Sequence, residues 1–247
     1  MKTVAALAIA LLFVAPGASS AQIADELSRR QALERYRVGQ ELLTAERYEQ
    51  AAAEFTAAIE LDPLLTLAHY GLGQSYMALK RYASAVQAFT GCKDAYARIA
   101  TLSQSNALES ARRQDEEIRI LRDFITAAMQ GNIKGANEGN IAPQQKRLDE
   151  LETMRRGTTV GARFQIPAEV LLALGSAHYR NGQAADAERE WAAAVTTNPR
   201  LGEAHNNLAV LYMQTGRKQQ AEDAIRAAER ASFRVHPQLK ADIAKMK

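Results

Sequence analysis

The sequence contains four histidines and one cysteine, residue types that often bind metals or take part in nucleophilic catalysis. They are His69, His178, His205, His236 and Cys92. Such residues bind a metal ion or perform nucleophilic catalysis when several stand at short, fixed spacings or when a base is placed beside a nucleophile. Here they are scattered along the chain, and no nucleophile–base pair recurs at a constant spacing. The sequence therefore predicts no catalytic residue and no metal site, and we expect a protein that is not an enzyme.

A series of glycines could in principle form a phosphate-binding loop. Gly131, Gly135 and Gly139 recur every four residues, but the Gly-Lys-Ser/Thr ending of such a loop is missing. We interpret the series as a flexible turn and predict no cofactor.

The charge balance argues against a nucleic-acid partner. The formal net charge is +3, and acidic and basic residues are interspersed along the chain. A nucleic-acid-binding surface needs clustered positive charge. The single cysteine, Cys92, excludes an internal disulfide.

Residues 1–21 have the layout of a secretory signal peptide. Lys2 precedes an apolar run from Val4 to Val14, and small residues up to Ala21 offer a cleavage site. The run is shorter than the roughly 20 residues that a spanning helix needs, although an uncleaved anchor is the alternative. We expect an exported protein of the bacterial periplasm, with no transmembrane segment after cleavage.

Two pairs of segments repeat one pattern of apolar and small residues with a shift of 34 residues. Spacings of three and four within each segment predict two amphipathic helices per repeat. Gly182 and Gly216 suit the left-handed turn between such helices. The first pair is marked by Arg35, Val38, Gly39, Leu42, Ala51, Phe55, Ala58 and Pro63, then by His69, Leu72, Gly73, Tyr76, Ala85, Phe89 and Cys92. The second is marked by Leu171, Leu174, Gly175, His178, Ala187, Trp191, Ala194 and Pro199, then by His205, Leu208, Ala209, Tyr212, Ala221, Ile225 and Ala228.

This pattern resembles the tetratricopeptide repeat, in which Trp-x2-Leu-Gly-x2-Tyr is followed by Ala-x3-Phe and Pro. The resemblance covers four copies, at 32–65, 66–99, 168–201 and 202–235. It implies an all-α superhelix of stacked helical pairs. Gly39, Gly73, Gly175 and Ala209 would then mark close helix contacts, met by Ala51, Ala85, Ala187 and Ala221. His69 and His205 take the family's Trp position and His178 its Tyr position, so we interpret them as packing residues.

The resulting division of the chain has five parts. They are the signal peptide at 1–21, a first repeat pair at 22–99, a helical hairpin and linker at 100–167, a second repeat pair at 168–235 and a capping helix at 236–247. We expect one long helix from Ala95 to Gln130 and another opening at Pro143, which together form a protruding hairpin. The hairpin could dock a partner, support self-association, or act as a spacer packed back on the repeats.

The resemblance also implies a binding surface, because the first helix of each such repeat lines a concave groove that receives a peptide or a partner helix. The inward candidates are Tyr36, Arg37, Gln40, Tyr70, Gln74, Met77, Ser176, Tyr179, Arg180, Asn206, Asn207, Val210 and Met213. We therefore expect a non-catalytic scaffold or adaptor that binds a protein or peptide in the cell envelope. The alternative is a structural subunit that forms a homo-oligomer through the hairpin.

Overall fold

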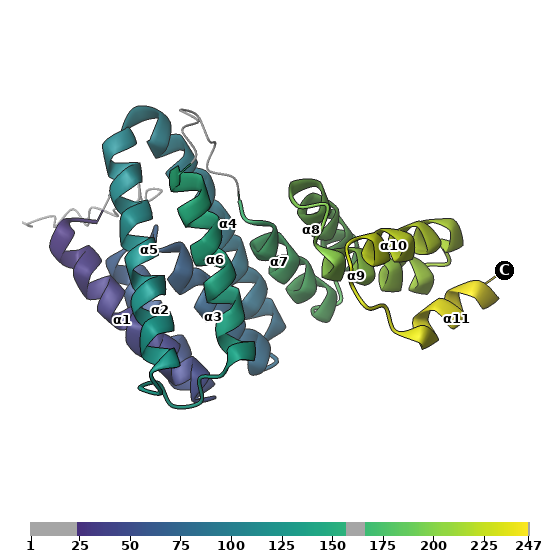
Figure 1. The fold of residues 1–247 in the computed structure, drawn as a ribbon, viewed down its shortest axis with the longest axis horizontal. Coiled ribbons are helices and arrows are strands. Elements are labelled where there is room, and N and C mark those ends of the chain that lie inside the picture. Colours follow the sequence, from purple (N-terminus) through teal and green to yellow (C-terminus); the bar gives the residue numbers. More distant parts are fainter. Residues whose placement is uncertain (1–23, 157–165, 247) are drawn as a thin grey trace, which may run out of the picture.

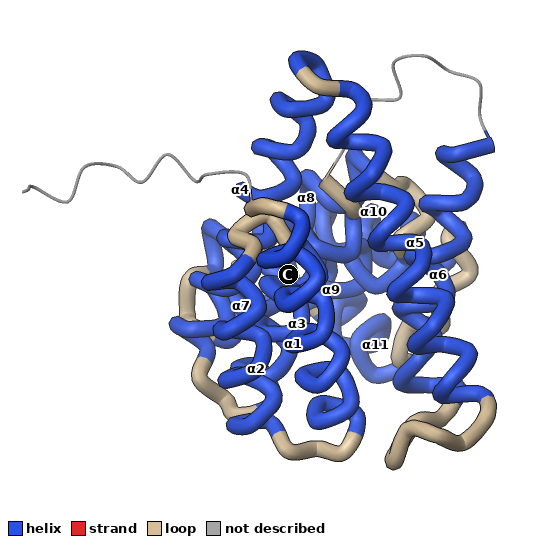
Figure 2. The backbone as a smooth tube through the Cα atoms, turned by 90° about the vertical axis from the view of Figure 1, so that its left-hand side faces the viewer, coloured by secondary structure: helices blue, strands red, loops and turns tan. Residues whose placement is uncertain are grey.

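The computed structural model describes residues 24–156 and 166–246, and every regular element in these stretches is an α-helix (Figure 1). In chain order the helices are α1 (Glu26–Thr44), α2 (Tyr48–Leu61), α3 (Thr66–Ala78), α4 (Tyr82–Ser105), α5 (Ala107–Met129), α6 (Glu138–Arg156), α7 (Ala168–Arg180), α8 (Ala184–Thr197), α9 (Gly202–Gln214), α10 (Lys218–Arg230) and α11 (Pro237–Lys245). Within these stretches the chain has no strand (Figure 2), which confirms the all-α class. The expected signal peptide and most of the linker after α6 lie outside the described residues.

Four antiparallel helix pairs make the repeats: α1 with α2, α3 with α4, α7 with α8, and α9 with α10. The two repeat pairs stack directly on each other, because α4 packs against α7. Ala85 and Phe89 from α4 form one buried cluster with Leu174 and Ala177 from α7. A helical pair cannot bury its apolar face alone, so this contact lets one core run through both pairs.

The turn inside each repeat contains one residue in the left-handed conformation. Gly182 and Gly216 have φ values of 79° and 74°, as the sequence predicted, and Glu46 and Lys80 adopt φ values of 59° and 57° at the corresponding positions. In every repeat the residue after it donates a backbone hydrogen bond across the helix end, as Arg47 does to Leu42 at 2.9 Å. A side chain in this conformation costs roughly 1–2 kcal/mol, which the repeated hydrogen-bond pattern offsets.

Aromatic rings fill the space that the recurring small residues leave open within the repeats. A Cβ atom placed on Gly73 would stand 2.5 Å from the ring of Phe89, and one on Gly175 would stand 2.6 Å from the ring of Trp191. The sequence-based expectation that Ala85 and Ala187 meet these glycines was therefore incomplete. Those alanines are fully buried, but the aromatic residue four positions later makes the closest approach.

The segment between the repeat pairs differs from its prediction in three respects. The long helix expected through Asn106 is broken there, because Asn106 leaves the helical conformation (φ −145°, ψ 79°) and its side chain caps α5 at the Glu109 N–H. α6 begins at Glu138, five residues before the expected start at Pro143. The hairpin formed by α5 and α6 does not protrude, since it lies back across the first repeat pair (Figure 1).

The last helix, α11, packs against the second repeat pair. Pro237 occupies its first turn, and the His236 ring accepts a hydrogen bond from the Gln238 N–H at 3.2 Å. Ile243 is buried, and Leu239 and Met246 pack against the same cluster. These contacts cover apolar surface that the end of a repeat stack would otherwise leave exposed.

We predict that Gly73→Ala destabilises the protein by roughly 1–3 kcal/mol, because the added methyl group has no space beside the Phe89 ring. Phe89→Leu alone should also be destabilising. The double variant should be more stable than the sum of the two effects predicts, by at least about 0.5 kcal/mol, because the smaller side chain makes room for the methyl group. Urea unfolding of the four proteins measures this coupling, and strictly additive effects would contradict the packing described here.

Candidate binding grooves

The first groove, which is the inner face of α1 and α3, is occupied by the α5–α6 hairpin. Ile120 of α5 packs against the cluster that contains Tyr36 and Phe55. Leu67 of α3 packs against a second cluster, formed by Ile118, Leu121 and Leu151 of the hairpin. The apolar stripe of α5 is thereby buried within its own chain. Of the three roles considered for the hairpin, a spacer packed back on the repeats agrees best with these contacts.

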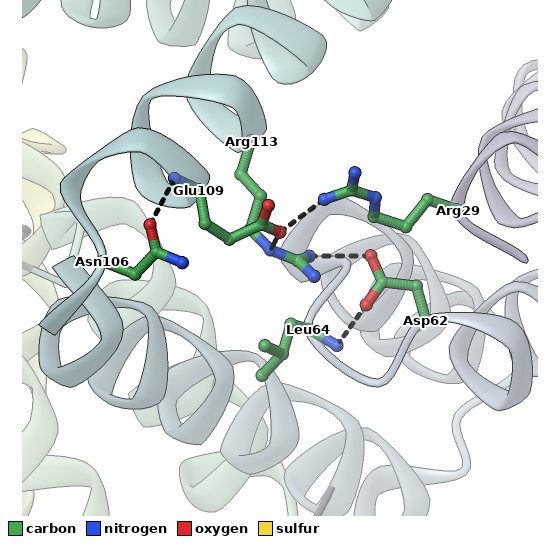
Figure 3. A network of polar contacts seen from close by, with 6 residues as sticks. All are labelled: Arg29, Asp62, Leu64, Asn106, Glu109 and Arg113. Atoms are coloured by element: carbon green, nitrogen blue, oxygen red, sulfur yellow. Dashed lines mark hydrogen bonds and ion pairs between the residues drawn. The ribbon is translucent and has the colours of Figure 1, made fainter. Parts of the chain in front are cut away.

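A network of buried charges joins the start of this hairpin to the first repeat pair (Figure 3). Nη1 of Arg113 in α5 donates to Oδ2 of Asp62 at 2.8 Å, and its Nε donates to Oε1 of Glu109 at 3.1 Å. Arg29 of α1 pairs with the same Glu109 oxygen. The other Asp62 oxygen accepts the Leu64 N–H at 3.1 Å. Side-chain exposure in this network is 12% or less, so removal of one partner would leave a buried charge without compensation.

A second charged contact joins α6 to the same repeats. Nε of Arg147 donates to Oε1 of Glu117 at 2.9 Å, and the guanidinium lies over the Tyr96 ring, 5.4 Å from its centre. The side chains of Arg147 and Glu117 are each 14% exposed. A planar, always charged guanidinium suits both a carboxylate and an aromatic face. Arg147 therefore ties both helices of the hairpin to α4.

The candidate residues of the first repeat pair lie in four different surroundings. Tyr36 and Gln40 are buried beneath the hairpin, and Tyr70 and Gln74 line a pocket between it and α3. Met77 packs into the cluster that joins α4 to α7. The remaining candidate, Arg37, is exposed and forms ion pairs with Glu34 and Glu41 of its own helix. The hairpin covers Tyr36 and Gln40, so a partner could contact them only through a side chain that enters this pocket, which both residues also line.

The second predicted groove is the face of α7 and α9 that carries the remaining candidates, and three of these side chains already have partners. Ser176 donates to the Leu172 carbonyl at 2.8 Å. The Tyr179 hydroxyl donates to Gln214 at 2.8 Å, while its ring packs at 5.5 Å from that of Trp191. Met213 packs against the core of the second pair. These residues shape the groove wall.

The other four candidates of the second groove are three polar residues whose side chains have no partner in the described part of the chain, and one apolar residue. Arg180 is exposed, and Asn206, Asn207 and Val210 are half-buried. Within residues 24–156 and 166–246, no side-chain hydrogen bond or ion pair engages Arg180, Asn206 or Asn207. One guanidinium and two amides therefore present donors and acceptors beside an apolar residue, which suits the backbone and side chains of a peptide.

The histidines and the cysteine are engaged in packing and local hydrogen bonds. His69 and His205 each place Nε2 3.0 Å from the carbonyl of a proline six residues earlier, Pro63 and Pro199. Burial lowers the pKa of His69 and raises that of the Cys92 thiol, so Cys92 is not poised to form a nucleophilic thiolate. The part of the chain that the structure describes contains no group of three or more His, Cys, Asp or Glu able to hold a metal ion. None of its helices is long and apolar enough to cross a membrane.

Sequence reasoning missed the contribution of the hairpin to this surface. Ile118, Leu121 and Ile125 stand three and four residues apart in the sequence, a spacing that predicts one apolar face on α5 and was the available signal that this helix must pack on something. Sequence reasoning did not single out Tyr96, Arg147 or Glu150, because isolated charges on a helix are usually solvated and these acquire partners only through the docking of α6.

A family model of the tetratricopeptide repeat matches residues 36–98 and 172–233, which are 125 of the 247 residues. The chain therefore belongs to the tetratricopeptide-repeat family, and the matched segments fall in the two repeat pairs. Among curated proteins none matches the chain.

Several solved structures are similar to it at low sequence identity. PilW, a widely conserved type IV pilus biogenesis factor, is 17% identical over 90% of this chain and 87% of its own, with a TM-score of 0.41. YrrB, a TPR protein with an unusual peptide-binding site, is 18% identical over 87% and 92%, with a TM-score of 0.30. A thermophilic TPR protein of Thermus thermophilus is 19% identical over 87% and 98%, with a TM-score of 0.33. At these TM-scores the likenesses carry no argument about function.

We predict that Arg113→Met loosens the hairpin, because it leaves the buried Asp62 carboxylate without its cation. The loss should be about 3–5 kcal/mol of stability, together with faster amide exchange throughout α5 and α6. Hydrogen–deuterium exchange and urea unfolding measure the two effects.

The matched control is Arg122→Met, which removes the same group from an exposed position of the same helix. It should change stability by no more than about 1 kcal/mol. Equal effects of the two substitutions would show that the buried network does not hold the hairpin.

Proposed function

We propose that this tetratricopeptide-repeat protein is a non-catalytic scaffold or adaptor that binds a protein or peptide in the second groove. The observation that carries the proposal is the contrast between the two inner faces. The first groove is occupied by the chain's own hairpin, whereas Arg180, Asn206 and Asn207 in the second have no side-chain partner among the described residues.

The chemistry of the second groove fits an extended peptide. Each asparagine amide offers two donors and an acceptor, and so can pair with a peptide N–H and C=O together. Val210 beside them supplies apolar area, and Arg180 at the end of α7 supplies a charge for an acidic group. Tyr179 and Trp191 give this wall a fixed shape, which lowers the ordering cost of binding.

The proposed scaffold role also agrees with the surroundings of the histidines and the cysteine, which were the first candidates for catalytic or metal-binding residues. His69 and His205 support turns between helices, and Cys92 is a buried thiol whose Sγ lies 3.4 Å from the Thr66 carbonyl oxygen. Self-association through the hairpin is less well supported, because the apolar stripe of α5 is used within the chain.

The cell envelope is the proposed location, and the layout of residues 1–21 supports it. We predict that protein recovered from its native host begins at Gln22, because signal peptidase would cleave after Ala21. Intact-mass measurement and fractionation of the cells check this prediction. A chain that keeps Met1 and remains in the cytoplasm would contradict it.

The binding function can be tested with a variant in which Arg180, Asn206 and Asn207 are changed to alanine. Crosslinking and affinity capture from the native cells identify candidate partners, and binding of the purified partner is then measured. We expect at least about a tenfold loss of affinity, since one charged and several neutral hydrogen bonds disappear.

A matched control changes Arg230, Gln219 and Gln220 of α10, which are exposed, to alanine. This variant removes one guanidinium and two amides from another helix and should bind normally. If both variants bind the partner equally well, the second groove is not the binding site. Recovery of no protein other than further copies of this chain would favour the self-associating alternative.

A further inference from the structure

The hairpin does not fill the first groove completely, and the space that remains is a small pocket. It lies between α1, α3, α4, the hairpin helices α5 and α6, and the start of α7, and we call it the hairpin pocket. Its volume is about 80 Å³, against the roughly 10–15 Å³ that one water molecule needs. It can therefore hold several waters, or one side chain, but not a folded segment. Its polar lining includes Tyr36, Tyr70, Tyr96, Arg147, Glu150 and Glu169.

Two tyrosines in this lining have hydroxyl groups without partners. Tyr36 is only 3% exposed, and Tyr70 is half-buried. Within the described residues, neither hydroxyl takes part in a hydrogen bond. Neither hydroxyl oxygen is among the fully buried atoms without a partner, so both are open to the pocket and can pair with a molecule that enters it.

The charges around the pocket identify the kind of molecule. Glu117, Glu150 and Glu169 contribute three carboxylates, and Lys146 and Arg147 contribute two cations. Arg147 is committed to Glu117 at 2.9 Å, and its Nη1 is 3.5 Å from Glu150. That separation is longer than the roughly 2.7–2.9 Å of a strong charged hydrogen bond. Burial, and then the nearby Glu169 carboxylate, raise the pKa of Glu150. With three carboxylates and two cations the cluster carries one excess negative charge, and Glu150 is the carboxylate whose ion-pair contact is the longest.

Aromatic faces and an under-neutralised carboxylate together suit an organic cation. Tyrosine rings attract ammonium and guanidinium groups, and the Arg147 guanidinium already lies on Tyr96. The rest of the lining is largely apolar, with Leu67, Leu121 and Val170 among its residues. An alkyl stem could pack against these residues while its charged end reaches Glu150.

The position of the pocket indicates where the cation comes from. Glu169 and Lys146 form an exposed ion pair at its rim, with side chains 30% and 47% exposed. Glu169 precedes Ser176 by two turns on the same face of α7, roughly 10 Å along the helix axis. The rim therefore continues into the second groove, and a peptide lying there could insert one side chain into the pocket.

We propose that the hairpin pocket binds one lysine or arginine side chain of the partner, with Glu150 as the acceptor of its charge and Tyr36 and Tyr70 as its walls. The partner's presence in the second groove rests on the proposed function above. The pocket itself can be tested without any partner.

The test uses the full chain with isotope-labelled tyrosine rings, and the Tyr36, Tyr70 and Tyr96 signals are assigned by Tyr→Phe substitution. Four probes are titrated: the N-acetyl, N-methylamide derivatives of lysine, arginine and norleucine, and free n-butylammonium. We expect saturable shifts of the three rings with the lysine or the arginine derivative. Norleucine has the same stem without the charge, so it should bind about tenfold more weakly or worse.

Variants connect the binding to Glu150. Glu150→Gln should weaken the binding of the charged derivative about tenfold. Asp149→Asn should leave it unchanged, because Asp149 is exposed and adjacent in sequence but does not line the pocket. Equal binding of norleucine and lysine, no ring shifts with any probe, or an unaffected Glu150→Gln variant would each overturn the proposal. Binding of butylammonium without binding of either derivative would also overturn it, since the cation would then be a free amine.

Failure of this inference and failure of the proposed function can be told apart. If the lysine derivative binds but the second-groove variant captures its partner normally, the proposal for the pocket is supported and the second groove is not the binding site. If the second-groove variant loses its partner while no cation enters the pocket, only the present inference is wrong.

Discussion

Docking of the hairpin buries several charged side chains, and each of them needs a partner. This requirement is the constraint on which the arrangement of the hairpin and the repeats depends. Arg113 must reach Asp62, and Arg147 must reach both Glu117 and the face of Tyr96. A buried charge without a partner costs several kcal/mol, so only a few positions of α5 and α6 against the repeats are acceptable. Apolar contacts such as that of Leu121 with Leu67 are less selective, because they would tolerate a shift along the helix. The charges therefore specify the docked position, and burial of the apolar stripe supplies much of the driving force.

The docked hairpin gives the two repeat pairs different inner surfaces, although their cores are built alike. In both pairs an aromatic ring packs against a glycine of the preceding helix, and a histidine contacts a proline carbonyl six residues before it. The hairpin covers the inner face of the first pair, and among the described residues it does not pack on the corresponding face of the second pair. The two repeat pairs thus share the same packing within each unit and differ in what covers their inner faces.

The two repeat pairs stack on each other although the hairpin separates them in sequence. α4 and α7 are separated in sequence by the whole hairpin, yet Phe89 and Leu174 share one buried cluster, and Lys93 pairs with Glu190 of α8 at 2.8 Å. Each repeat needs only its immediate neighbours for its core. The hairpin can therefore occupy one side of the stack while α7 continues from α4.

The sequence by itself determined the repeats, because helix periodicity, the 34-residue shift, and glycines at fixed positions are local properties that each unit carries in full. It predicted the helical pairs, the left-handed turns at Gly182 and Gly216, and an apolar face on α5. The repeat pattern also predicted which residues face inward. For the second repeat pair, including Asn206 and Asn207, their role in binding stays a prediction. The sequence did not predict the break at Asn106, the start of α6 at Glu138, or the burial of Tyr36 and Gln40. Those features depend on where the hairpin packs, which is decided by contacts between residues 30 or more positions apart, such as Arg113 with Asp62 and Arg147 with Glu117. From the sequence alone, a charged residue on a helix is expected to face solvent. Its partner lies on another helix, and only the tertiary structure places the two side chains together.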